Sequence, residues 1–63
     1  MKPYNYQQIR LEHGYTQAQI ASKLHIARST YTCYERGLRD MPTELLIKLA
    51  TVYNCSVDKL LRG

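Results

Sequence analysis

Residues 16–37, TQAQIASKLHIARSTYTCYERG, contain two short helical patterns that follow one another closely. In the first pattern Ile20 and Leu24 fall on one helix face, and in the second Tyr31 and Tyr34 do so. Only a few residues connect the two patterns, so the helices that they predict must cross at a steep angle. This stretch therefore predicts a helix-turn-helix.

Local signals mark where the first of these helices begins and where the second ends. Thr16 is a favourable N-cap for the first helix, and Gln19 three residues later completes a capping box. The second helix is expected from about Arg28 to Arg36, and Gly37 suits the left-handed residue that follows a helix end.

The outward face of the second helix carries the chemistry of base recognition. With the tyrosines turned inward, the residues that point outward are Arg28, Ser29, Thr32 and Cys33. An arginine in the first turn can donate two hydrogen bonds to guanine O6 and N7, and the hydroxyls can bond base edges or phosphates. The alternative is an ordinary solvated helix face, which these residues alone do not exclude.

Apolar patterns on either side of this stretch predict three further helices. One is expected from about Tyr4 to His13, another from about Pro42 to Tyr53, and a short last one after a cap at Ser56. No stretch alternates apolar and polar residues as a half-buried strand would. The sequence therefore predicts an all-α fold of five short packed helices.

Tyrosine is the dominant aromatic residue, since the chain has six tyrosines and no phenylalanine or tryptophan. Helical spacing favours core positions for four of them, with their hydroxyls near the surface: Tyr6, Tyr31, Tyr34 and Tyr53. A stacking platform for single-stranded nucleic acid is the alternative.

Positive charge is concentrated in the first two-thirds of the chain. The net charge is +4 at pH 7. Residues 1–39 hold six basic and two acidic residues, whereas residues 40–63 hold three of each. This asymmetry favours an anionic partner that docks on one side, and a basic surface kept for solubility is the alternative.

Length and residue types argue against several classes of protein. The 63 residues suffice for one domain, with no bilayer-spanning run and no start like that of a signal peptide. Cys33, Cys55, His13 and His25 do not stand at the close spacings of zinc sites, so neither a metal nor another cofactor is expected. No nucleophile–base set can be assembled, so we do not expect an enzyme. Because the sequence lacks a bilayer-spanning run and a signal-peptide-like start, we expect a cytoplasmic protein.

The combination of TQ, an inward alanine, RST and ERG at these distances resembles the XRE/Cro-like transcriptional regulators, the family of lambdoid phage repressors. The resemblance continues into IRLEHGYTQ before it and MPTELLIKLATVYNCSVDKLL after it, so it covers nearly the whole chain. It implies a lambda repressor-like fold and a single DNA-binding domain over residues 1–63, with the helix-turn-helix at about 16–36.

The resemblance also implies two sets of DNA contacts. The residues expected to contact bases are Arg28, Ser29, Thr32 and Cys33. The residues expected to contact phosphates are Thr16, Gln17, Lys23, Arg36 and Arg39.

One residue pair that matches the family pattern, and two residues that depart from it, concern the stability of the fold and not contact with DNA. Arg10 and Glu35 match a buried ion pair that ties the first helix to the third. Relatives usually have glycine where this chain has His25, a turn position that favours positive φ. Ala27 replaces the common Ser or Thr N-cap of the third helix, at a cost of about 0.5–2 kcal/mol.

The residues and the resemblance together predict a sequence-specific regulator of transcription that binds double-stranded DNA, with repression as its expected action. We expect a homodimer on an inverted-repeat operator, with the third helix of each copy in the major groove. The dimer surface is expected at the last helix, around Val57, Leu60 and Leu61, unless these residues only close the monomer core.

Regulation would come through protein concentration, a partner protein or a modification. The alternative function is a protein-binding module of the same fold, such as an antitoxin or an adaptor. Duplex DNA binding with a steep salt dependence would separate the two functions.

Overall fold

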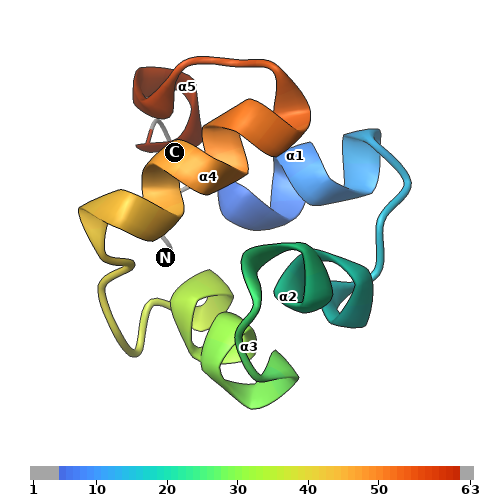
Figure 1. Cartoon of the computed structure of the whole chain (residues 1–63), viewed down its shortest axis with the longest axis vertical. Helices are drawn as coiled ribbons and strands as arrows, with labels where there is room; N and C mark the ends of the chain where they lie inside the picture. The colour runs from blue at the N-terminus through green and yellow to red at the C-terminus, as the bar shows by residue number, and fades with distance from the viewer. Residues whose placement is uncertain (1–4, 62–63) are drawn as a thin grey trace.

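The computed structural model of the chain describes residues 5–61, which form five α-helices without a strand (Figure 1). The all-α fold of five short helices is therefore confirmed. The helices are α1 (Tyr6–Glu12), α2 (Gln17–Leu24), α3 (Arg28–Arg36), α4 (Thr43–Tyr53) and α5 (Val57–Leu61).

The predicted helix bounds agree with these within one or two residues. The start expected at Tyr4 lies outside the described residues, and α1 ends one residue before His13. Pro42 precedes α4 as its N-cap instead of starting it. The Ser56 cap is present, since the Lys59 N–H donates to Ser56 Oγ at 3.1 Å. Within residues 5–61 no helix has both the length and the apolar character needed to cross a bilayer.

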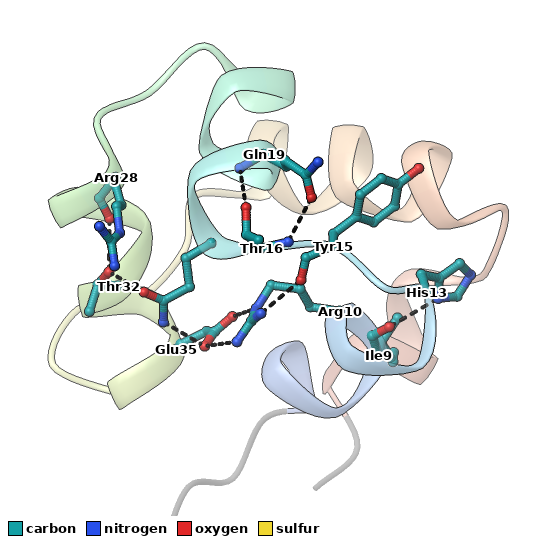
Figure 2. A network of polar contacts seen from close by, with 10 residues as sticks. Ile9, Arg10, His13, Tyr15, Thr16, Gln19, Arg28, Thr32 and Glu35 are labelled. Carbon is teal, nitrogen blue, oxygen red and sulfur yellow. Dashed lines mark hydrogen bonds and ion pairs between the residues drawn. The ribbon is translucent and has the colours of Figure 1, made fainter.

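The capping box at the start of α2 forms as the sequence predicts. The Gln19 N–H donates to Thr16 Oγ1 at 3.1 Å, and the Thr16 N–H donates to Gln19 Oε1 at 2.8 Å (Figure 2). These reciprocal bonds fix the residue at which α2 begins.

The two turns that bound α3 both use left-handed backbone. His25 has a φ of 58°, so it takes the conformation expected where relatives have glycine. Gly37 has a φ of 75°, and the next residue, Leu38, donates its N–H to the Cys33 carbonyl at 3.0 Å. This Schellman arrangement ends α3 and folds Leu38 back over its last turn. Ala27 makes no side-chain cap bond, as expected of alanine.

The core lies between all five helices. In Figure 1, α2 and α3 lie at one end of the molecule and α5 at the other, with α1 and α4 between them. The Asn5 N–H donates to the Leu60 carbonyl at 2.9 Å, which joins the start of α1 to α5. The buried apolar residues are Tyr6, Ile9, Ile20, Ala21, Leu24, Tyr31, Tyr34, Met41, Leu46, Leu49, Ala50, Tyr53 and Leu60.

Two expectations about buried side chains need correction. The four tyrosines are in the core as predicted, but the hydroxyls of Tyr31 and Tyr53 are not near the surface. Both are buried, and neither has a hydrogen-bond partner within residues 5–61. Burial raises the pKa of both phenols above the ordinary tyrosine value. The protein encloses both hydroxyl oxygens, so the hydroxyl end of each ring does not reach water.

The second correction concerns the three apolar residues of α5. Leu60 is fully buried and closes the monomer core, so it is not available to a dimer surface. Val57 is partly buried against the core, whereas Leu61 is 38% exposed and stays available to a dimer surface. Val57 and Leu60 are three residues apart and share the helix face that meets the core, so Leu61 falls outside that face.

Candidate nucleic-acid interface

An open hollow of about 460 Å³ lies over the outward face of α3. All four residues expected to contact bases line it, and it also contains residues from α2 and from the loop after α3. Its lining includes two arginines and no acidic residue: Gln17, Arg28, Ser29, Thr32, Cys33, Arg36 and Leu38. The packing of α2 against α3 therefore brings the predicted recognition face and two predicted phosphate contacts onto one cationic surface.

A second hollow of about 700 Å³ surrounds the start of α2. It shares Gln17 and Arg28 with the first hollow, so the two hollows form one continuous surface, which we call the α2–α3 surface. The other residues that line it are Arg10, Leu11, Gly14, Tyr15, Thr16 and Ala18.

The first turn of α2 leaves backbone donors for a ligand. The capping box engages the N–H groups of Thr16 and Gln19, and the Ile20 N–H donates to the Thr16 carbonyl. The N–H groups of Gln17 and Ala18 have no acceptor within residues 5–61. Free amides at the positive end of a helix, with an arginine nearby, favour an anion such as a phosphate.

A buried ion pair lies beneath the α2–α3 surface. Arg10 Nε donates to Glu35 Oε2 at 2.6 Å, and Arg10 Nη2 donates to Glu35 Oε1 at 3.3 Å. Arg10 Nη1 also donates to the Tyr15 carbonyl at 2.8 Å (Figure 2). The pair expected from the family resemblance is therefore present, and it ties α1 to α3 and to the turn that precedes α2.

The electrostatics of this pair favour the charged carboxylate. Burial acts to raise the pKa of Glu35, but hydrogen bonds from Arg10 and Gln17 outweigh burial and hold that pKa below its ordinary value. The hydrogen bond to Glu35 raises the pKa of Arg10. Both groups therefore stay ionised at neutral pH, and the pair contributes no net charge to the surface above it.

Gln17 and Thr32 connect the ion pair to the α2–α3 surface. Gln17 Nε2 donates to Glu35 Oε1 at 3.0 Å. Thr32 Oγ1 lies 3.1 Å from Gln17 Oε1 and 2.9 Å from the Arg28 carbonyl, and its single proton can be donated to either oxygen. Two residues expected to contact DNA are thus also held by bonds within the protein.

Two of the expected phosphate contacts line neither hollow. Lys23 lies with Tyr15 around a third depression, which shares Tyr15 and Ala18 with the hollow around the start of α2, and its Nζ is 5.3 Å from the centroid of the Tyr15 ring. Arg39 is exposed in the loop after α3. The phosphate roles of both residues stay predictions.

One residue of the hollow over α3 was absent from the sequence-based prediction. Leu38 is 69% exposed and lines the hollow over α3. The signal for it is an apolar residue directly after Gly37, at the position that a Schellman turn folds back over the helix. Within residues 5–61 there is no group of three or more His, Cys, Asp or Glu side chains that could hold a metal ion.

Residues 7–60 match the family model described as helix-turn-helix. The chain is 46% identical over 52 residues to the HTH-type transcriptional regulator ImmR of Bacillus subtilis (strain 168). This match covers 82% of this chain and 41% of the relative. It is also 37% identical over 59 residues to the uncharacterized HTH-type transcriptional regulator YqaE of the same organism, covering 94% of this chain and 51% of the relative. The chain thus spans about half the length of the curated relatives it matches.

A solved structure has the same arrangement of helices. The N-terminal DNA-binding domain of SinR from Bacillus subtilis superposes with a TM-score of 0.79 at 33% sequence identity, over 94% of this chain and 87% of that one. These matches agree with the lambda repressor-like fold and with the expectation that the chain is not an enzyme. The chain belongs to the XRE-like helix-turn-helix family of transcriptional regulators.

Proposed function

We propose that the chain is the part of a transcriptional regulator that binds double-stranded DNA in a sequence-specific manner, with α3 in the major groove. The observation that carries the proposal is the α2–α3 surface. It combines an exposed helix face with an arginine and hydroxyls, a second arginine at the end of that helix, and free amides at the start of the neighbouring helix. This is the donor set that base edges and phosphates require.

The base-contacting roles follow from position on α3. Arg28 lies in the first turn, which enters the groove deepest in this class of protein, and it is proposed to bind a guanine. Ser29 and Cys33 lie along the same hollow and are proposed as the other base contacts. The Thr32 hydroxyl already has acceptors within the protein, so we leave Thr32 out of this set.

The phosphate-contacting roles are proposed for residues around the rim. Gln17 and Thr16 stand at the start of α2 beside the free amides, and Arg36 lines the hollow over α3. Arg39 follows in the exposed loop, where a flexible cation can reach the backbone. Lys23 lines the neighbouring depression, which shares Tyr15 and Ala18 with the hollow around the start of α2, and is proposed as a further phosphate contact.

We further propose that two copies bind an inverted repeat, that the complex represses transcription, and that the protein acts in the cytoplasm. One α3 helix reads too few bases for tight specific binding, whereas two copies about 34 Å apart would read one site on one face of the duplex. Leu61 and Ile47, which is 55% exposed on α4, are proposed for the contact between copies. Sedimentation of the DNA complex should give two protein copies per duplex, and one copy per duplex would refute the dimer.

A protein-binding module is the second candidate, and the exposed Leu38 favours it. An exposed apolar side chain that lines a cationic hollow is unusual for a face that only contacts phosphates. In that case an acidic partner with an apolar residue would occupy the α2–α3 surface.

Selection of bound duplexes from a random pool tests the proposed function directly. We expect enrichment of a palindromic site with a guanine in each half-site. We also expect the logarithm of the association constant to fall linearly with the logarithm of the salt concentration. Absence of any enriched sequence, together with weak binding that is insensitive to salt, would refute DNA recognition and favour the protein-binding module.

A further inference from the structure

A line of hydrogen bonds runs from the buried ion pair to the α2–α3 surface through Gln17 and Thr32. We propose that Thr32 is a positioning residue, which holds the Gln17 side chain for contact with a DNA phosphate, and that it does not read a base. The proposal rests on the proposed function, because it specifies how one phosphate contact is made.

The chemistry of its neighbours determines which way the Gln17 amide faces. Glu35 is a carboxylate that can only accept, so the Gln17 atom that lies 3.0 Å from it must be the donor Nε2. Gln17 Oε1 therefore faces Thr32, which is 3.1 Å away. Each end of the amide has one partner, one on the buried ion pair and one on the surface of α3.

The orientation of Gln17 depends on the single proton of the Thr32 hydroxyl. That proton can point to Gln17 Oε1 at 3.1 Å or to the Arg28 carbonyl at 2.9 Å. Without a proton between them, two oxygens at this distance would repel each other. A side chain of the same shape that lacks the hydroxyl would thus leave one end of the Gln17 amide without a partner.

A held Gln17 is placed where an anion would bind. Gln17 is the first residue of α2 and lines both hollows of the α2–α3 surface. One Nε2 hydrogen is given to Glu35, and the second is left for a ligand beside the free N–H groups of Gln17 and Ala18. A side chain that is already ordered loses less conformational freedom when it binds a phosphate, so the contact is stronger.

The chain offers a matched control for removal of the hydroxyl. Thr51 Oγ1 donates to the Ile47 carbonyl at 2.9 Å, the same backbone bond four residues back that Thr32 makes to Arg28. Thr51 lies on α4, outside both hollows. Comparing Thr32→Val with Thr51→Val therefore separates the bond to Gln17 from the loss of a helix back-bond, and Thr32→Ser restores the hydroxyl.

The first experiment uses nuclear magnetic resonance on the free protein. In the wild type and in Thr51→Val, we expect the two Gln17 Nε2 hydrogens to give separate signals that exchange slowly with solvent. In Thr32→Val they should move toward the values of exposed glutamines, and Thr32→Ser should restore them. Unchanged Gln17 signals in Thr32→Val would overturn the positioning role.

The second experiment measures binding to the selected duplex while single phosphates are replaced by neutral methylphosphonates. Thr32→Val should weaken binding about threefold to tenfold, by the same factor for different sequences, with a melting temperature close to that of Thr51→Val. Neutralising the phosphate that Gln17 contacts should weaken duplex binding by the wild type more than it weakens binding by Gln17→Ala or by Thr32→Val. Thr32→Ser should recover the wild-type pattern.

The two experiments separate failure of the inference from failure of the proposed function. A changed base preference in Thr32→Val with an unchanged phosphate pattern would show that Thr32 reads a base, and would overturn the inference alone. If the wild type binds no duplex, the proposed function is refuted, and the phosphate role of Gln17 falls with it even where the resonance data show a held side chain.

Discussion

The two ends of the molecule hold their helices together by different means. Around α2 and α3, an ion pair and several side-chain hydrogen bonds lie beneath a cationic surface, and they tie three helices to one carboxylate. Around α4 and α5, the buried side chains are mainly apolar, among them Leu46, Leu49 and Leu60, and a backbone hydrogen bond from Asn5 to Leu60 joins α5 to the start of α1.

This difference teaches that the polar network sets the positions and orientations of surface side chains, whereas the apolar packing holds the helices together. Apolar contacts stabilise in proportion to buried area and tolerate small shifts of one helix against another. Hydrogen bonds require fixed distances and angles, so they are suited to keep Arg28 and Gln17 where a ligand needs them. Each prediction below perturbs one side of this comparison and leaves the other intact.

The largest effect is expected when Glu35 is removed. Glu35→Ala leaves the Arg10 guanidinium buried without its partner, which should lower the free energy of unfolding by about 3–5 kcal/mol. Thermal or urea unfolding measures this change. Glu12→Ala, which removes an exposed carboxylate from α1, serves as the control and should change stability by less than about 0.5 kcal/mol. An unchanged melting temperature for Glu35→Ala would contradict a central role of the network.

The next largest effect is expected on DNA binding when Arg28 is truncated. Arg28→Ala should lower the preference for the selected site over a scrambled duplex by about 1–3 kcal/mol, because a bidentate guanine contact is lost. Thr51→Val changes an exposed residue of α4 outside both hollows and should leave base preference unchanged. Quantitative gel-shift titrations measure both variants. Undiminished discrimination by Arg28→Ala would mean that Arg28 does not read a base.

Acid should weaken the polar end of the molecule selectively. The pKa of Glu35 is lowered in the folded state, so its stabilisation is fully present above the unfolded value of about 4.3 and is lost as the pH falls through the folded pKa. The free energy of unfolding should therefore fall with pH below about 4.3. This part of the slope should be missing in Glu35→Gln and retained in Glu12→Gln, as urea titrations at several pH values would show. Equal slopes in both variants would contradict the assignment to Glu35.

The smallest effect is expected for a hydroxyl that has no partner. Tyr53→Phe on α4 removes a buried hydroxyl without a hydrogen-bond acceptor within residues 5–61, so stability should change by less than about 0.5 kcal/mol. Tyr53→Ala, in contrast, should cost several kcal/mol because a core ring is lost. A large loss in Tyr53→Phe would show that the hydroxyl makes a stabilising bond in solution.

The sequence by itself determined the helices and their order. Local signals are short-range, and the structure follows them closely: the capping box at Thr16 and Gln19, the left-handed Gly37, and the apolar spacing of the core residues. The ion pair between Arg10 and Glu35 also followed from the sequence, through the family resemblance. Periodicity places Arg28, Ser29, Thr32 and Cys33 on one helix face without reference to any distant residue.

The tertiary structure alone decided what each of those side chains meets. Thr32 and Gln17 are far apart in sequence, so only the crossing of α2 and α3 shows that they bond each other. Only packing shows that the Tyr31 and Tyr53 hydroxyls are buried, that Leu61 is exposed, and that Leu38 joins the surface. The physical reason is that helix propensity and capping act over a few residues, whereas burial and side-chain partners depend on how separate helices come together.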